Sequence, residues 1–233
     1  MLFNQTAHQK KQLEVISQLE LSLTKDKLDF TVVEPVADFV NDQRLALTSV
    51  HFPNQDFINK IQQTVIEPLR VIQPEHFYYS AEFMHMTVKN VKTINDPPLF
   101  DQRVITTTKQ VFDQVVPQHQ AFNAYYYRLL LFPYNLALIG TTDQELDELV
   151  SDLDTSLNQA GVPDNKKYLN DRYFFSNVTL ARFNRPVNQE FRAKVAELSA
   201  SFRPFSYRLD SLTLLTCNAV MNQRRDISTY QLK

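Results

Sequence analysis

The chain has 233 residues, a formal charge of -2 and 43% hydrophobic residues, so it can bury a sizeable core and is too apolar for a disordered protein. Its two glycines exclude the glycine-rich phosphate loops of common nucleotide-binding folds. The near-neutral charge gives no basic field for holding a long nucleic-acid duplex, and the single cysteine, Cys217, permits no internal disulfide and fits a reducing compartment.

The sequence shows no targeting or membrane signal. Residues 1–11 are polar and lack the apolar centre of a secretory signal. No apolar run approaches the roughly 18 residues that a membrane-spanning helix needs. We therefore expect a cytoplasmic protein that does not associate with membranes, and we expect a monomer.

Helical and strand patterns alternate along the first half of the chain. In chain order we predict an amphipathic helix over residues 8–24, an irregular stretch over 28–42 and a strand over 45–50. Next we predict a helix that Asn54 caps and that Pro68 and Pro74 end. A strand carrying His85 and Thr87, a helix over 101–116 and a strand over 122–131 then follow.

The same order of elements begins again in the second half, displaced by about ninety residues. Here we predict a strand over residues 135–140, a helix capped by Thr142 and running to about 159, a loop around Pro163, a strand carrying Asn177 and Thr179, a helix over 188–201, and closing strands over 206–216 and 227–232.

Internal repetition of this kind is a strong indication of architecture. It predicts an α+β protein with a duplicated two-lobed fold, in which mostly antiparallel sheets flank a central cleft with pseudo-twofold symmetry. We expect an N-terminal helical extension over residues 1–42 and one domain over 43–233. Its lobes would span about 43–131 and 132–233.

Each repeat contains one short motif. Residues 83–88 and 175–180 both carry phenylalanine, a polar residue and threonine at alternate positions; the polar residue is His85 in the first copy and Asn177 in the second. Because alternate residues of a strand share a face, each copy presents these three side chains together. Two such strands side by side would form a small, nearly symmetric polar site.

The two motifs, the second continuing as Thr-Leu-Ala-Arg to Arg182, resemble the two-histidine phosphoesterase superfamily, which includes the bacterial 2′-5′ RNA ligase-like (LigT-like) proteins and cyclic nucleotide phosphodiesterases. The signature of that superfamily is one His-x-Thr or His-x-Ser motif in each lobe. The resemblance covers about residues 43–233. It implies, as substrate or ligand, a nucleotide or RNA end with a 2′,3′-cyclic or 2′-5′ phosphodiester, and no metal or other cofactor.

The resemblance also implies roles for the motif residues. His85 would be a general acid or base, since the pKa of imidazole lies near neutrality. Thr87 and Thr179 would donate hydrogen bonds to the non-bridging phosphate oxygens. Asn177 stands where the superfamily has its second histidine, and an amide does not transfer protons near pH 7.

Losing one acid–base group typically lowers the rate by about 10²–10⁴. Three hypotheses for the site follow. His85 could catalyse slowly with water as the second acid–base group, His51 or His119 could replace the missing histidine, or the site could bind its ligand without turnover. The alternative for His85 itself is a satisfied core histidine, which the repeated context disfavours.

Further residues are assigned to substrate binding by their strand positions: Phe83, Phe175, Tyr127 and Lys89. The aromatic rings would stack on a base, the alternative being core packing. Lys89 shares a predicted strand face with His85, the alternative being a solvated lysine. Arg182, three residues after Thr179, is expected to point away from it. The scattered histidines predict no metal site.

Three functions compete at this point. The first is an attenuated phosphoesterase, a 2′,3′-cyclic phosphodiesterase or 2′-5′ RNA ligase-like hydrolase if active. The second is a non-catalytic module that binds a nucleotide or RNA end on the same fold. The third is a structural or partner-binding role that uses the amphipathic helix over residues 8–24.

Overall fold

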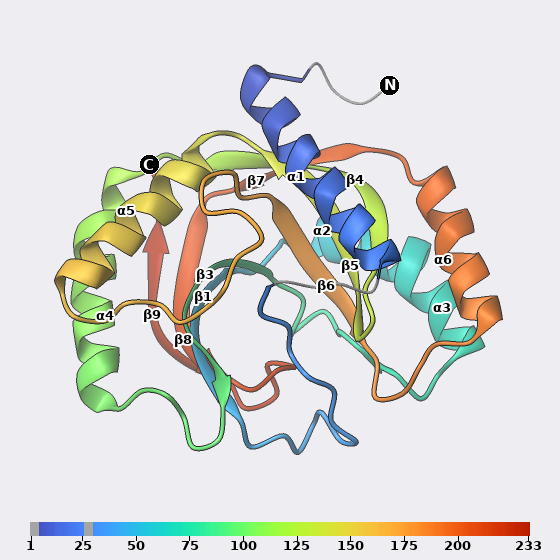
Figure 1. Cartoon of the computed structure of the whole chain (residues 1–233), viewed down its shortest axis with the longest axis horizontal. Helices are drawn as coiled ribbons and strands as arrows, with labels where there is room; N and C mark the ends of the chain where they lie inside the picture. The colour runs from blue at the N-terminus through green and yellow to red at the C-terminus, as the bar shows by residue number, and fades with distance from the viewer. Residues whose placement is uncertain (1–4, 26–29) are drawn as a thin grey trace.

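A nine-stranded antiparallel sheet forms the centre of the molecule (Figure 1). The computed structural model describes residues 5–25 and 30–233. The strands are β1 (Leu45–His51), β2 (Phe77–Tyr78), β3 (Met86–Asn95), β4 (Phe122–Leu131), β5 (Asn135–Thr142), β6 (Ser176–Arg182), β7 (Phe205–Leu209), β8 (Ser211–Cys217) and β9 (Arg225–Gln231). They lie in the order β7-β4-β5-β6-β3-β1-β8-β9, with β2 beside β6.

The helices lie on both faces of this sheet. They are α1 (Ala7–Thr24), α2 (Gln55–Ile61), a π-helical turn (Gln62–Ile66), α3 (Glu67–Ile72), α4 (Gln102–Val115), a 3-10 turn (Val116–Gln118), α5 (Glu145–Gln159) and α6 (Gln189–Ser201). Helices α4 and α5 pack together over β3 and β9, whereas α3 and α6 pack together and α6 lies on β4. Helix α1 crosses the opposite face, against β5, as the blue helix of Figure 1 shows.

Apart from the short β2 beside β6, the sheet has two halves of four strands that meet at β3 and β6, through the single residue pair Met86 and Val178. This arrangement confirms the duplicated α+β fold with its two lobes. The halves exchange strands, however, because β4 pairs with β5 and β8 pairs with β1. The expected lobe boundary at residues 131/132 therefore does not separate the halves. The chain turns directly from β4 into β5, and strands joined by a short turn become neighbours.

Most helix starts agree with the sequence. Asn54 caps α2, where its side chain accepts a hydrogen bond from the backbone N–H of Phe57 at 3.0 Å. Two predicted helix boundaries were wrong, and the one strand predicted over 206–216 is two strands, β7 and β8, in different halves of the sheet. Pro68 does not end the helix, since the π turn before α3 accommodates a residue without an N–H donor. Thr142 does not cap α5; it ends β5, and α5 begins three residues later.

The main core lies between the sheet and helices α2 to α6. Its fully buried members come from both repeats: Leu47, Ile61, Phe112, Leu138, Leu149, Leu180, Phe191 and Leu214. The opposite face of the sheet, called the inner face below, carries Thr87, Ala137 and Thr179. This face holds the candidate site.

The N-terminal segment covers part of the inner face. Helix α1 confirms the helix predicted over 8–24, and Ile16 packs on Ala137 and Ile139 of β5. Its apolar side is therefore buried within the chain, which removes the main support for a partner-binding role. Residues 30–44 then cross the inner face without helix or strand. This matches the irregular stretch predicted from residue 28, whose first two residues lie outside the described part.

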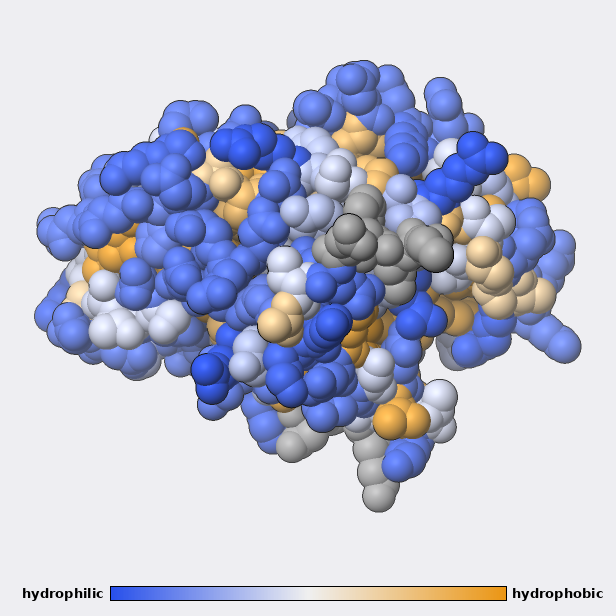
Figure 2. Space-filling view, turned by 90° about the horizontal axis from the view of Figure 1, so that it is seen from above, coloured by the Kyte–Doolittle hydropathy of each residue, from blue (hydrophilic) through white to orange (hydrophobic). Residues whose placement is uncertain are grey.

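No helix among residues 5–25 and 30–233 is both long and apolar enough to span a membrane. The face seen in Figure 2 is mainly hydrophilic, and its hydrophobic residues form small patches separated by polar ones.

Candidate functional site

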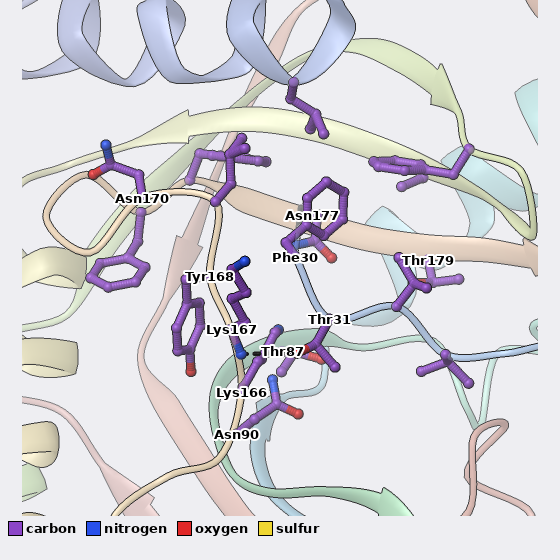
Figure 3. A pocket seen from close by; sticks show the side chains of 18 of the residues that line it. Phe30, Thr31, Thr87, Asn90, Lys166, Lys167, Tyr168, Asn170, Asn177 and Thr179 are labelled. Atoms are coloured by element: carbon purple, nitrogen blue, oxygen red, sulfur yellow. Dashed lines mark hydrogen bonds between the residues drawn. The ribbon is translucent and has the colours of Figure 1, made fainter. Parts of the chain in front are cut away.

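The two predicted motif strands lie side by side at the centre of the inner face. The antiparallel register of Met86 with Val178 sets Thr87 opposite Asn177 and His85 opposite Thr179. Met86 and Val178 are buried in the main core, so their strand neighbours point to the inner face. Figure 3 shows Thr87 on one strand, with Asn177 and Thr179 on the other.

These residues line two adjoining cavities, called the cleft below, of about 270 Å³ and about 160 Å³. The larger cavity is lined by Thr87, Asn177 and Thr179, and the smaller one by His85 and Thr87. Five side chains with hydrogen-bonding groups border both cavities: Thr31, Thr87, Asn90, Lys166 and Arg182. The cleft therefore brings together the four motif residues that the sequence assigned to catalysis.

His85 is held as a neutral imidazole. Its Nδ1 lies 2.7 Å from the backbone carbonyl of Phe83, and because a carbonyl only accepts, Nδ1 carries the proton. Nε2 then keeps a free electron pair. The residue is only 8% exposed, and this burial lowers the pKa of His85 to about 4, with Arg182 and Arg224 acting in the same direction. At neutral pH His85 is therefore uncharged, with Nε2 unprotonated.

A β-bulge changes which residues of β3 face the cleft. Thr87 pairs with Val50 and Lys89 with Ser49, so Val88 is an extra residue and the alternation shifts by one. Lys89, expected on the face of His85, is instead fully buried on the other side, where it forms ion pairs with Asp154 and Asp164. It is neither solvated nor lining either cavity, and Asn90 takes the cleft position.

An equivalent bulge occurs in β6. Ala137 pairs with Thr179 and Leu136 with Ala181, so Leu180 is the extra residue. Arg182 consequently lies on the same face as Thr179, contrary to the expectation from its odd spacing. Its Nε donates to the hydroxyl of Tyr79 and to the carbonyl of Ala219, both at 2.9 Å. These bonds hold the guanidinium at the junction of the two cavities.

The cleft is positively charged. Lys166, Lys167 and Arg182 line it, whereas no Asp or Glu is among its lining residues in the described part of the chain. This positively charged lining contrasts with the net charge of -2 of the whole protein. Together with the hydroxyl and amide donors of β3 and β6, it favours an anionic ligand.

Residues 30–33, called the strap, cross the mouth of the cleft; all four line the larger cavity, and residues 31–33 also line the smaller one. The backbone N–H of Thr31 donates to the carbonyl of Lys167, and the N–H of Lys167 donates to the hydroxyl of Thr31, both at 2.9 Å. Figure 3 marks the second bond and shows Phe30 and Thr31 in front of the motif strands. The strap and the loop that carries Lys167 are thus hydrogen-bonded to each other, and together they form one wall of the cleft.

The three aromatic residues assigned to substrate binding have different surroundings. Phe175 lines the larger cavity. Phe83 packs with Val50 and Leu215, and Tyr127 packs under α1 against Ile16 and Ala137; neither borders the cleft. Other rings line the larger cavity and have no signal in the motifs: Phe30, Phe132, Tyr168, Tyr173 and Phe174.

Neither histidine considered for rescue reaches the cleft. Both ring nitrogens of His51 are engaged, with the carbonyl of Ser211 at 2.9 Å and the hydroxyl of Tyr207 at 3.2 Å. His119 lies near Glu145 and Asp152 beside another cavity. Among the residues with a described position, no cluster of three or more His, Cys, Asp or Glu is arranged to hold a metal ion.

Comparisons with known proteins identify the fold. No family model and no curated protein sequence matches the chain. Solved structures do: LigT of E. coli complexed with 3′-AMP has a TM-score of 0.53 at 14% identity, covering 82% of this chain and 99% of that one. The protein TT0787 of Thermus thermophilus gives 0.55 at 12% identity, covering 82% and 98%.

A third solved structure, the conserved protein of unknown function ATU0111 from Agrobacterium tumefaciens, gives a TM-score of 0.55 at 14% identity and covers 90% of this chain and 97% of that one. The chain therefore has the fold of LigT-like two-histidine phosphoesterases. At these identities the likeness defines the fold alone.

Proposed function

We propose that the cleft binds a nucleotide or RNA end with a 2′,3′-cyclic or 2′-5′ phosphodiester and hydrolyses it slowly. The observation that carries this proposal is the meeting of His85, Thr87 and Thr179 in one cleft without a lining carboxylate among the described residues. E. coli LigT, which shares the fold, has been crystallised with ATP, NADP+ and 3′-AMP, all of them phosphorylated nucleotides.

The chemistry would start at His85. Its Nε2 accepts a proton from water as the water oxygen attacks phosphorus. The hydroxyl groups of Thr87 and Thr179 donate hydrogen bonds to the non-bridging oxygens as negative charge develops there. Asn177 adds an amide donor to the same cavity but no proton transfer. The slow rate follows from this missing second acid–base group.

The alternative is a binding module without turnover on the same fold. It is favoured by Asn177 and by the strap, which narrows access to the motif residues. Both functions require the same cleft and the same class of ligand, and they differ only in hydrolysis.

Hydrolysis of 2′,3′-cyclic AMP and of a 2′-5′-linked diadenylate separates the two. We expect slow turnover by the unmodified chain, a loss of about 10²–10⁴ in His85→Ala, and a gain in Asn177→His. His119→Gln serves as the control, because it removes a histidine that lies outside the cleft. Binding should be measured in parallel by calorimetry with 3′-AMP.

The outcomes are distinct. Turnover that His85→Ala abolishes and His119→Gln leaves unchanged supports the enzyme. Binding of 3′-AMP without turnover supports the binding module. If the unmodified chain binds neither 3′-AMP nor the cyclic nucleotide, both proposals fail.

A further inference from the structure

The loop between α5 and β6 is fixed to strand β3 next to the cleft. Lys89 of β3 forms an ion pair with Asp164, and Lys92 donates to the carbonyl of Pro163. The backbone N–H of Thr93 donates to the side-chain oxygen of Asn165 at 2.8 Å, and the amide of Asn165 donates back to the Thr93 hydroxyl at 2.9 Å. These contacts fix three consecutive residues of the loop.

The next residue of the loop, Lys166, borders both cavities of the cleft together with Thr87 and Arg182. Its backbone N–H donates to the Asp164 carboxylate at 3.2 Å, and its ammonium lies 5.0 Å from the centre of the Tyr168 ring. Figure 3 shows Lys166 beside Thr87 and Asn90, across the cavity from Asn177.

We propose that Lys166 is the proton donor that takes the place of the missing second histidine. This inference rests on the proposed phosphodiester site. In that site His85 acts as the base, position 177 provides no acid, and Lys166 is a cation of the cleft that no carboxylate ion pair holds among the described residues.

The electrostatic surroundings suit this role. Burial lowers the pKa of Lys166 to about 8, the charge of Lys89 adds to this effect, and Asp164 opposes it. The other ionisable groups around it are Asp154 of α5, Tyr168 of the loop and Arg182 of β6. At neutral pH the ammonium is thus mainly protonated and still acidic enough to release a proton.

The step balances. Nε2 of His85 takes a proton from water, the water oxygen forms a bond to phosphorus, and the bond from phosphorus to the leaving ribose oxygen breaks. Nζ of Lys166 gives one proton to that oxygen. Exchange with bulk water then removes the proton from His85 and restores the one on Lys166, so the enzyme is unchanged after the cycle.

The test compares Lys166→Met, Lys166→Arg and the double variant Lys166→Met with Asn177→His, using 2′,3′-cyclic AMP. Methionine should lower kcat by about 10²-fold or more. Arginine keeps the charge but holds its protons too tightly to donate them, so KM should stay near its value while kcat falls. The double variant should regain turnover, because a histidine at 177 supplies the acid by the other route.

The pH profile gives a second measurement. The unmodified chain should lose kcat as the pH rises through about 8, and this limb should be absent from the double variant. Lys10→Met, on the exposed surface of α1, is the matched control and should change neither kcat nor the limb.

Other results overturn the proposal. Equal kcat in the unmodified chain and Lys166→Met rules out proton donation. Unchanged kcat in Lys166→Arg with a raised KM in Lys166→Met makes Lys166 a phosphate-binding cation only. An unmodified chain that binds 3′-AMP without turnover refutes the donor role but leaves the binding module, whereas absence of any binding refutes the proposed function as well.

Discussion

The buried amide of Gln12 is predicted to hold helix α1 on the inner face. The residue has no exposed surface. Its Oε1 accepts from the backbone N–H of Thr142 at 2.9 Å, and its Nε2 donates to the Thr142 hydroxyl at 2.7 Å and to the carbonyl of Phe174. One side chain thus connects α1 to β5 and to the segment just before β6. The substitution Gln12→Met keeps the size of the side chain and removes all three bonds.

The expected loss follows from the groups left behind. With α1 still docked, the N–H of Thr142 and the carbonyl of Phe174 would be buried without partners, at about 1–3 kcal/mol each, which gives a total of about 2–6 kcal/mol. Helix α1 can avoid part of this loss of stability by detaching from the sheet, but detachment exposes Val15, Ile16 and Leu19 to water. Exposing each of these side chains costs about 1.5–3 kcal/mol. Both routes are costly, so a clear destabilisation is expected.

Urea unfolding measures the total loss in the free energy of unfolding, and amide hydrogen exchange shows which elements lose stability. In Gln12→Met the amides of α1 should exchange faster, whereas those of β4 should follow the global stability. Because Val15 and Leu19 also line the larger cavity, detachment should also open the cleft and raise the rate at which ligand binds. Gln18→Met, an exposed position on the same helix, is the matched control. A change in unfolding free energy below about 0.5 kcal/mol, with α1 still protected, would refute the reasoning.

Two further predictions concern buried ionisable groups. Lys89→Met should destabilise the protein by about 3–5 kcal/mol in urea unfolding, because it leaves Asp154 and Asp164 without their cation. Adding Asp164→Asn should recover part of this loss. An unchanged free energy of unfolding in Lys89→Met would mean that Lys89 does not form these ion pairs. The second prediction concerns His85, whose imidazole has a pKa near 6.5 in the unfolded chain and about 4 in the folded protein. Between these two pH values the unfolded state binds more protons than the folded state. The free energy of unfolding should therefore fall as the pH drops from 6.5 to 4, by up to about 3 kcal/mol. His85→Gln should remove this part of the pH dependence, and an unchanged slope would contradict the lowered pKa of His85.

The order of elements was predictable because hydrophobic periodicity is a local property. The helix over 8–24, the strand over 45–50 and the second strand over 135–140 all agree with α1, β1 and β5. The exchange of strands between the halves was not predictable in this way. It depends on which strands pair, and that is settled by the turn between β4 and β5 and by contacts far apart in the chain.

The motif residues were predictable only as far as strict alternation holds. One extra residue in each motif strand reverses the facing of the residues that directly follow it, which moves Lys89 out of the cleft and brings Arg182 in. The sequence has no periodic signal for a bulge, so Arg182 was expected to point away from Thr179. Lys166 had no signal at all, because its loop is positioned by side chains of a strand more than seventy residues earlier.

The bulges also define how far the symmetry of the cleft extends. Each follows its threonine by one residue, so the cleft positions in both halves are the polar motif residue, the threonine and the residue three places further on. The two sets are His85, Thr87 and Asn90 in β3, and Asn177, Thr179 and Arg182 in β6. Only the threonines match. The half that lacks the imidazole carries the arginine, so the cleft keeps its cationic character although one proton-transfer group is absent. Affinity for a phosphorylated ligand and the ability to hydrolyse it therefore depend on different residues, and substitutions at Arg182 and at Asn177 should affect them separately.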